Sequence, residues 1–243
     1  MLGARCLAGG PGWSGARKST LSATAREAPG SSSCCTRSVL ELRGNAMTAY
    51  DDLIDRLADR INSLPPRRQA IFFWCSAEAV ALYSGVRSLD AEEREATGLA
   101  LREAKYIVLK WGEEHVKEVA ESVRSLLDRP QPEYSVSIEC AWMCLDCVAR
   151  IACDDTYRPG VSVENVIRPS IASVSEEMFG AYQIGSGPDE GRQIALILAD
   201  PEVKEAVHYC WRAIAALESN ERDEPVMKML KQEAPALVPA RNI

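Results

Sequence analysis

Apolar residues recur at the spacing of an α-helix through most of this chain, and that periodicity constrains the fold more than any other feature. After Met47, for example, they come three or four positions apart. They are Tyr50, Leu53, Ile54, Leu57, Ala58 and Ile61. No run alternates between apolar and polar residues, so no strand is expected. The pattern predicts an all-α fold, a bundle of six to seven helices whose neighbours are largely antiparallel.

Proline and capping residues divide the periodic sequence into segments. Pro65 ends the first helix, because the residue before a proline leaves the helical region. Asp90 and Glu93 predict a capping box, and Asp200 followed by Pro201 predicts a second helix start. The expected helices span about 49–63, 66–84, 91–111, 134–153, 162–182 and 201–220, and shorter helical stretches run through Val116 to Leu127 and through Ile194 to Leu198. The second is apolar on nearly every side and is expected to be the central helix.

The first 46 residues differ from the rest in composition. They are rich in Gly, Ser and Arg and show no periodicity, so we expect a disordered leader over 1–46. It is interpreted either as an organelle transit peptide or as translated upstream sequence with the working start at Met47. Helical pattern begins directly after Met47, which favours the second interpretation. The all-α domain is expected over 47–221, followed by a flexible tail over 222–243.

Charge is unevenly distributed. Residues 1–46 carry six basic and two acidic side chains, whereas the remaining residues carry 22 basic and 33 acidic ones, a net charge of −11. Nucleic acids and anionic membranes both attract basic proteins, so neither is expected as a partner. An acidic domain instead suits a basic protein partner. No secretory signal or apolar run of membrane-spanning length is present, so we expect a cytoplasmic protein with reduced thiols.

Three cysteines, Cys140, Cys144 and Cys147, have the spacing of an iron–sulfur loop. On a helix they lie within about 80° of one another. The residues between them are helix formers, whereas a cluster loop usually has glycines or polar residues there. We therefore expect a buried packing stripe, with no metal and no cofactor. Cys144 and Cys147 also match the C-x-x-C redox motif, but they lie in mid-helix, where no helix N-terminus lowers a thiol pKa.

A small group of charged residues lies within the apolar helices. Its members are Glu78, Glu139, Asp146 and Arg150. Because an unpaired buried carboxylate is costly, they are expected to form a buried polar network, with Asp146 and Arg150 paired at i, i+4. A metal site built from the three carboxylates is the alternative, although the Glu-x-x-His signature of di-iron bundles is missing. No catalytic residue is assigned, since neither of the two histidines has the spacing of a zinc pair.

Three helical segments carry a resemblance to a known family. They are Phe72-Phe73-Trp74-Cys75-Ser76-Ala77-Glu78, Ile138-Glu139-Cys140-Ala141, and Asp200-Pro201-Glu202-Val203 through Trp211. They are similar to segments of the YjaG-like proteins, a bacterial family of unknown function (domain-of-unknown-function family 416). The resemblance covers most of 60–220 in helix order and implies an all-helical fold. That family is similar in turn to small helical immunity proteins of polymorphic-toxin systems, which implies a protein that binds its cognate toxin and blocks the active site.

These observations predict a cytosolic, acidic, all-helical protein-binding module, of which an immunity protein that neutralises a bacterial toxin is one form. Its partner is expected to be a protein, for example a basic toxin domain. The expected contact residues are Glu92, Glu93, Glu113, Glu114, Asp189 and Glu190. The alternative is an enzyme or a metal-binding helical protein that uses the carboxylates of the central helices.

Overall fold

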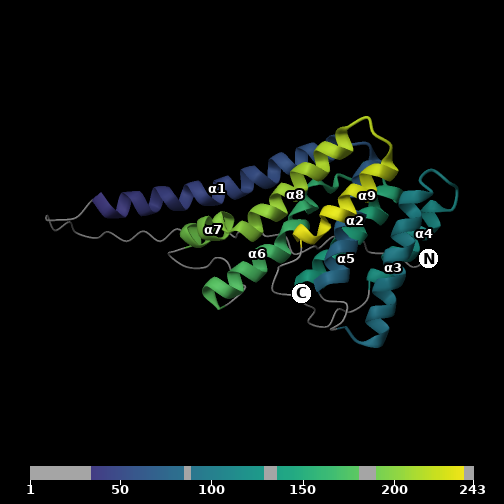
Figure 1. The fold of residues 1–243 in the computed structure, drawn as a ribbon, viewed down its shortest axis with the longest axis horizontal. Coiled ribbons are helices and arrows are strands. Elements are labelled where there is room, and N and C mark those ends of the chain that lie inside the picture. The colour runs from purple at the N-terminus through teal and green to yellow at the C-terminus, as the bar shows by residue number, and fades with distance from the viewer. Residues whose placement is uncertain (1–33, 85–88, 129–135, 181–189, 238–243) are drawn as a thin grey trace, which may run out of the picture.

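The computed structural model describes residues 34–84, 89–128, 136–180 and 190–237, and they form a helical bundle without strands (Figure 1). The helices are α1 (Cys34–Ser63), α2 (Pro66–Ser84), α3 (Ala91–Leu109), α4 (Val116–Leu127), α5 (Val136–Cys153), α6 (Glu164–Phe179), α7 (Glu190–Ala199), α8 (Pro201–Glu218) and α9 (Asp223–Glu233), with the 3₁₀ turns η2 (Pro159–Val163) and η3 (Ala234–Leu237). The all-α prediction is confirmed for these residues. The predicted number of six to seven helices is too low, because nine α-helices occur in the described part of the chain.

Helix α2 is the centre of the bundle, as its sequence predicts. It contacts α3, α5, α6, α8 and α9, and its contact with α5 is the most extensive in the structure. Phe72, Phe73 and Trp74 are all buried, and the rings of Phe72 and Phe73 meet edge to face with centroids 5.2 Å apart. Aromatic side chains on several sides of one helix can be buried only if other helices surround it.

The predicted helix starts at Asp90 and Asp200 are also confirmed. The Asp90 side chain accepts a hydrogen bond from the Glu93 amide, and the Glu93 side chain accepts one from the Asp90 amide, so both halves of the capping box form. The Asp200 side chain accepts from the Glu202 amide at 2.8 Å, with Pro201 in the first turn of α8. Each cap satisfies backbone donors that the first turn of a helix leaves unpaired.

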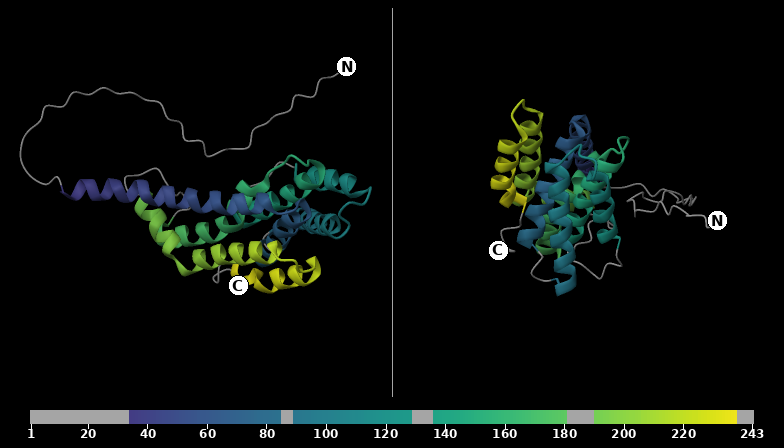
Figure 2. Two further views of the ribbon diagram at one scale, coloured as in Figure 1. Left: turned by 90° about the horizontal axis from the view of Figure 1, so that it is seen from above. Right: turned by 90° about the vertical axis from the view of Figure 1, so that its right-hand side faces the viewer.

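Helix α1 is longer than predicted. It begins at Cys34, so the expected boundary between 46 and 47 falls inside a helix. Leu57 and Ile61 anchor its C-terminal half in the core. The helix as a whole contacts η2 and α7. Figure 2 shows that its N-terminal half extends past the neighbouring helices. The expected disorder of residues 1–33 concerns a segment outside the described residues.

The C-terminal residues form a docked helix, and the prediction of a flexible tail is wrong for residues 223–237. Helix α9 and the turn η3 follow α8 and pack against it and against α2 (Figure 2). Val226, Leu230 and Leu237 are buried in the core. The segment looks polar in sequence because only one narrow stripe of α9 is apolar, and that stripe is covered by the helices beneath it.

The structure also has no helix, among the residues described, that is long and apolar enough to cross a membrane.

Candidate functional site

The cysteine stripe on α5 is buried, as predicted. Cys140, Cys144 and Cys147 are almost completely inaccessible to solvent. Burial raises the pKa of Cys140 to about 12 and that of Cys147 to about 11, and it raises the pKa of Cys144 well above its ordinary value. Thiolate is the form that binds metals and attacks disulfides. At neutral pH these side chains are therefore neutral thiols that pack as small apolar groups.

No group of three or more His, Cys, Asp or Glu side chains is arranged to hold a metal ion in the described segments.

The charged residues predicted as one buried network are divided among three ion pairs, and each lies at the edge of the core. Glu78 on α2 meets Lys231 on α9 at 2.5 Å. Glu139 on α5 lies 3.7 Å from Arg168 on α6. These contacts join different pairs of helices, so they stabilise helix packing and do not converge on a common site.

The third ion pair is the predicted one between Asp146 and Arg150, whose atoms Oδ2 and Nε lie 2.5 Å apart on successive turns of α5. Arg124 on α4 approaches the other carboxylate oxygen at 4.0 Å. The Arg150 guanidinium also lies over the ring of Tyr157, 5.8 Å from its centroid. Asp146 therefore links α4 and α5 rather than facing a cleft.

The acidic residues predicted as partner contacts lie at different places. Glu93 belongs to the capping box of α3, and Glu113 pairs with Lys110 at 3.0 Å. Glu92 and Glu114 are exposed. Asp189 and the side chain of Glu190 lie outside what the structure describes. The predicted contacts thus contain two residues that already stabilise local structure.

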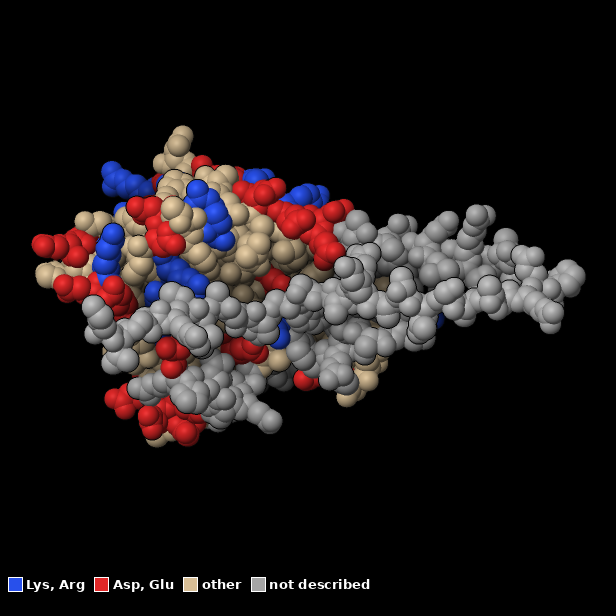
Figure 3. Space-filling model, turned by 180° about the vertical axis from the view of Figure 1, so that it is seen from behind, with Lys and Arg blue, Asp and Glu red and all other residues tan. Residues whose placement is uncertain are grey.

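A second group of carboxylates, not identified from the sequence, lies on α1. We call Asp51, Asp52, Asp55 and Asp59 the α1 acidic stripe. All four are exposed, and at 100° per residue they lie within about 100° of arc on the helix. None takes part in the ion pairs found among the described side chains. On the face shown in Figure 3, acidic side chains gather at the upper right of the coloured surface, with Lys and Arg side chains beside them. The spacing of these aspartates, opposite the apolar face of the same helix, is the signal that could have revealed them.

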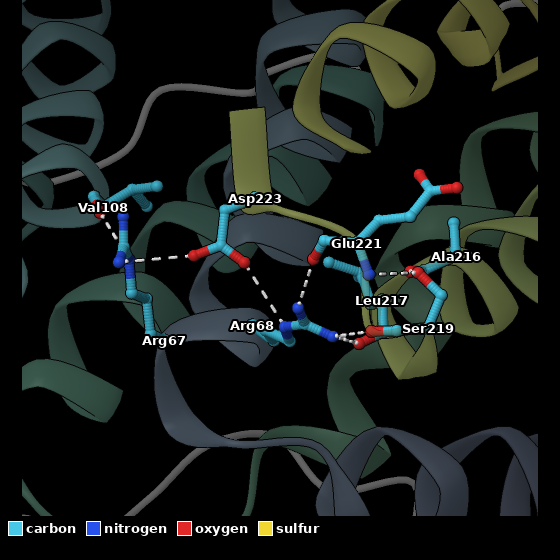
Figure 4. A network of polar contacts seen from close by, with 8 residues as sticks. All are labelled: Arg67, Arg68, Val108, Ala216, Leu217, Ser219, Glu221 and Asp223. Atoms are coloured by element: carbon cyan, nitrogen blue, oxygen red, sulfur yellow. Dashed lines mark hydrogen bonds and ion pairs between the residues drawn. The ribbon is translucent and has the colours of Figure 1, made fainter. Parts of the chain in front are cut away.

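A polar network that joins several helices is structural (Figure 4). The Arg68 guanidinium donates to the backbone carbonyls of Leu217, Ser219 and Glu221, at the C-terminal end of α8 and just beyond it. Asp223, the first residue of α9, lies 3.3 Å from both Arg67 and Arg68. A cation is favourable at a helix C-terminus, where the last carbonyls lack partners. The network therefore fixes the connection between α8 and α9.

Comparison with protein-family models, with curated proteins and with solved structures finds no match to this chain.

Proposed function

We propose that this chain is a cytosolic protein-binding module that recognises a basic partner through the α1 acidic stripe. The observation that carries the proposal is the presence of four exposed carboxylates on one face of α1. They lie in the part of the chain whose net charge is −11. Long-range attraction between such a surface and a basic protein raises the association rate by orders of magnitude at low salt.

An immunity protein is the specific form of this function that we propose. Its task, to capture a toxin before the toxin acts, favours fast association, which an acidic surface provides for a basic target. The resemblance to the YjaG-like family points in the same direction. The carboxylates that a metal-dependent enzyme would need, Glu78, Glu139 and Asp146, each face a Lys or Arg side chain. That arrangement favours the binding module over the alternative.

The experiment compares two variants that each lose four negative charges. In the first, Asp51, Asp52, Asp55 and Asp59 are replaced by Asn. In the second, Glu113, Glu114, Glu118 and Glu121 of the α4 region are replaced by Gln. The wild-type chain is immobilised, a retained protein is identified by mass spectrometry and purified, and its association rate with each variant is then measured at low and high salt.

We expect the α1 variant to associate at least about tenfold more slowly at low salt, and high salt to reduce the wild-type rate to a similar value. The α4 variant should change the rate much less. A larger effect of the α4 variant would place the contact at the predicted residues Glu113 and Glu114. An association rate that neither variant changes would contradict an electrostatically guided partner. Inhibition of a toxic activity of the retained protein would establish the immunity function, and its absence would exclude it.

A further inference from the structure

The N-terminal end of α9 is held firmly at its connection to α8. Helix α9 and the turn η3 are the last described elements, and residues 219–222 join them to α8. Arg68 donates to the carbonyls of Ser219 and Glu221 in this connection and meets Asp223, the first residue of α9, at 3.3 Å. Figure 2 shows α9 beside α8 at the outer edge of the bundle. The connection is therefore a fixed point at one end of an outer helix.

The C-terminal end of α9 is held by two ion pairs that face solvent. Lys231 meets Glu78 of α2 at 2.5 Å, and Glu233 meets Arg212 of α8 at 2.6 Å. We call these two ion pairs the α9 clasp. The side chains of Lys231 and Arg212 are 39% and 45% exposed. Ion pairs of this exposure contribute little to stability and are weakened by salt, so the clasp holds this end only loosely.

Between its two ends, α9 buries little apolar surface. Of its 11 residues, Val226 and Leu230 are buried, two methionines are partly buried beside them, and η3 adds Ala234 and Leu237. Helix α5, with 18 residues, has twelve that are buried. The hydrophobic contribution to stability follows the apolar area removed from water. Segments with few buried apolar contacts open at a lower free energy than the core, so α9 is expected to open before α5.

Buried side chains of the central helix lie next to the α9 clasp. The Lys231 ammonium lies 4.4 Å from the ring centroid of Trp74, which is 2% exposed. Burial raises the pKa of the neighbouring Cys75 to about 12, and the positive charge of Lys231 opposes that rise. The indole N–H of Trp74 is buried and has no acceptor among the described residues. A buried donor without a partner is costly, so uncovering Trp74 is less unfavourable than its apolar area alone implies.

We propose that α9 and η3 form a strap that turns about the connection held by Arg68 and opens while the remaining helices stay folded. Opening uncovers the part of α2 that carries Trp74 and Cys75. Because a helix of this length is marginal in water on its own, α9 loses its helical structure when it leaves the bundle. The α9 clasp thus controls access to the central helix, and any ligand that binds the open form better than the closed form shifts the equilibrium toward it.

Alkylation of the thiols of the full chain by iodoacetamide, with each modified cysteine located by mass spectrometry, tests the strap. A buried thiol reacts only after the opening that uncovers it. Cys75 should react at least about tenfold faster than Cys144 of α5, which only global unfolding uncovers. Its rate should also rise less steeply with urea, because opening of the strap exposes less surface than global unfolding. A Cys75 that reacts no faster than Cys144, or with the same urea dependence, would overturn the proposal.

Variants at two equally buried positions separate the strap from the rest of the bundle. Leu230→Ala on α9 should speed labelling of Cys75 and Cys144 by the same factor, at least about thirtyfold, because its contacts are lost in both the open and the unfolded state. Val123→Ala on α4, a helix that packs on α3 and α5, should speed labelling of Cys144 alone.

Lys231→Met tests the α9 clasp directly. It removes the charge that meets Glu78 and should speed labelling of Cys75 about threefold. Labelling of Cys75 that rises in Val123→Ala as much as that of Cys144 would show that α9 opens only together with the whole bundle. Labelling that neither Leu230→Ala nor Lys231→Met changes would show that another opening uncovers Cys75. Either result would overturn the proposal.

Discussion

At the scale of single residues, Gly160 controls how closely η2 approaches α1. Its amide donates to the side-chain oxygen of Asn62 at 2.9 Å, and an ideal Cβ would lie only 2.4 Å from the Ala58 carbonyl oxygen. Gly160→Ala should therefore separate η2 from α1 and lower the free energy of unfolding by about 2 kcal/mol. Urea unfolding measures this, with Val161→Ala at the exposed neighbouring position as control. An alanine variant as stable as the control would contradict the close approach.

The buried thiols predict how stability depends on pH. Burial raises the pKa of Cys75 from its ordinary value of 9.0 to about 12. The unfolded chain therefore ionises at lower pH than the folded chain. This contribution to stability is fully present below pH 9.0 and is lost as the pH rises toward 12. Urea unfolding at about pH 8 and at about pH 10 measures this effect. Between these two pH values, the free energy of unfolding of the wild type should fall by about 1.4 kcal/mol more than that of Cys75→Ala. If the wild type and Cys75→Ala lost the same free energy of unfolding, ionisation of Cys75 would not contribute to the pH dependence of stability.

At the scale of secondary-structure elements, Arg68 holds the connection between α8 and α9. Its guanidinium satisfies carbonyls at the end of α8 and meets Asp223 at the start of α9. Arg68→Ala should lower the free energy of unfolding by about 2–3 kcal/mol, because charge-assisted hydrogen bonds are lost and carbonyls are left unpaired. Arg68→Lys should recover little of the lost free energy of unfolding, since one ammonium group cannot reproduce the planar set of N–H donors of a guanidinium. Urea unfolding measures both changes.

Arg67→Ala is the matched control, because Arg67 is the more exposed of the two arginines, at 39% against 20%. It also meets Asp223, and among the described residues it donates to one backbone carbonyl, that of Val108. Arg67→Ala should lower the free energy of unfolding by about 1 kcal/mol or less. An Arg67 variant that is destabilised as much as the Arg68 variant would place the main connection on Asp223 rather than on the carbonyls of α8.

Helix ends show how far elements can be predicted from sequence. The starts at Asp90 and Asp200 are confirmed because a capping side chain bonds to backbone amides two or three residues away. The start of α1 and the existence of α9 were predicted incorrectly. Neither has a local signal of comparable strength, and α9 is stabilised by Val226 and Leu230, which contact helices distant in sequence.

At the scale of the whole molecule, acidic charge and the helical bundle are properties of the composition and the periodicity. The position of the candidate binding surface does not follow from composition or periodicity. Glu113 looked equivalent to Glu114 in the sequence, yet it pairs with Lys110. The aspartates of α1 form a candidate contact surface because all four are exposed on one face of the helix. Which carboxylates remain accessible to a partner depends on the ion pairs that the packed helices form.

The amino-acid sequence alone determined that the chain is helical, that α2 lies at its centre and that Cys140, Cys144 and Cys147 are interior residues. Each of these properties follows from periodicity within one helix, which is local information. Only the tertiary structure decided which basic side chain each carboxylate meets, where the last helix docks and which of the described side chains of α1 are exposed. These depend on contacts between residues far apart in the chain, whose partners a local pattern does not specify.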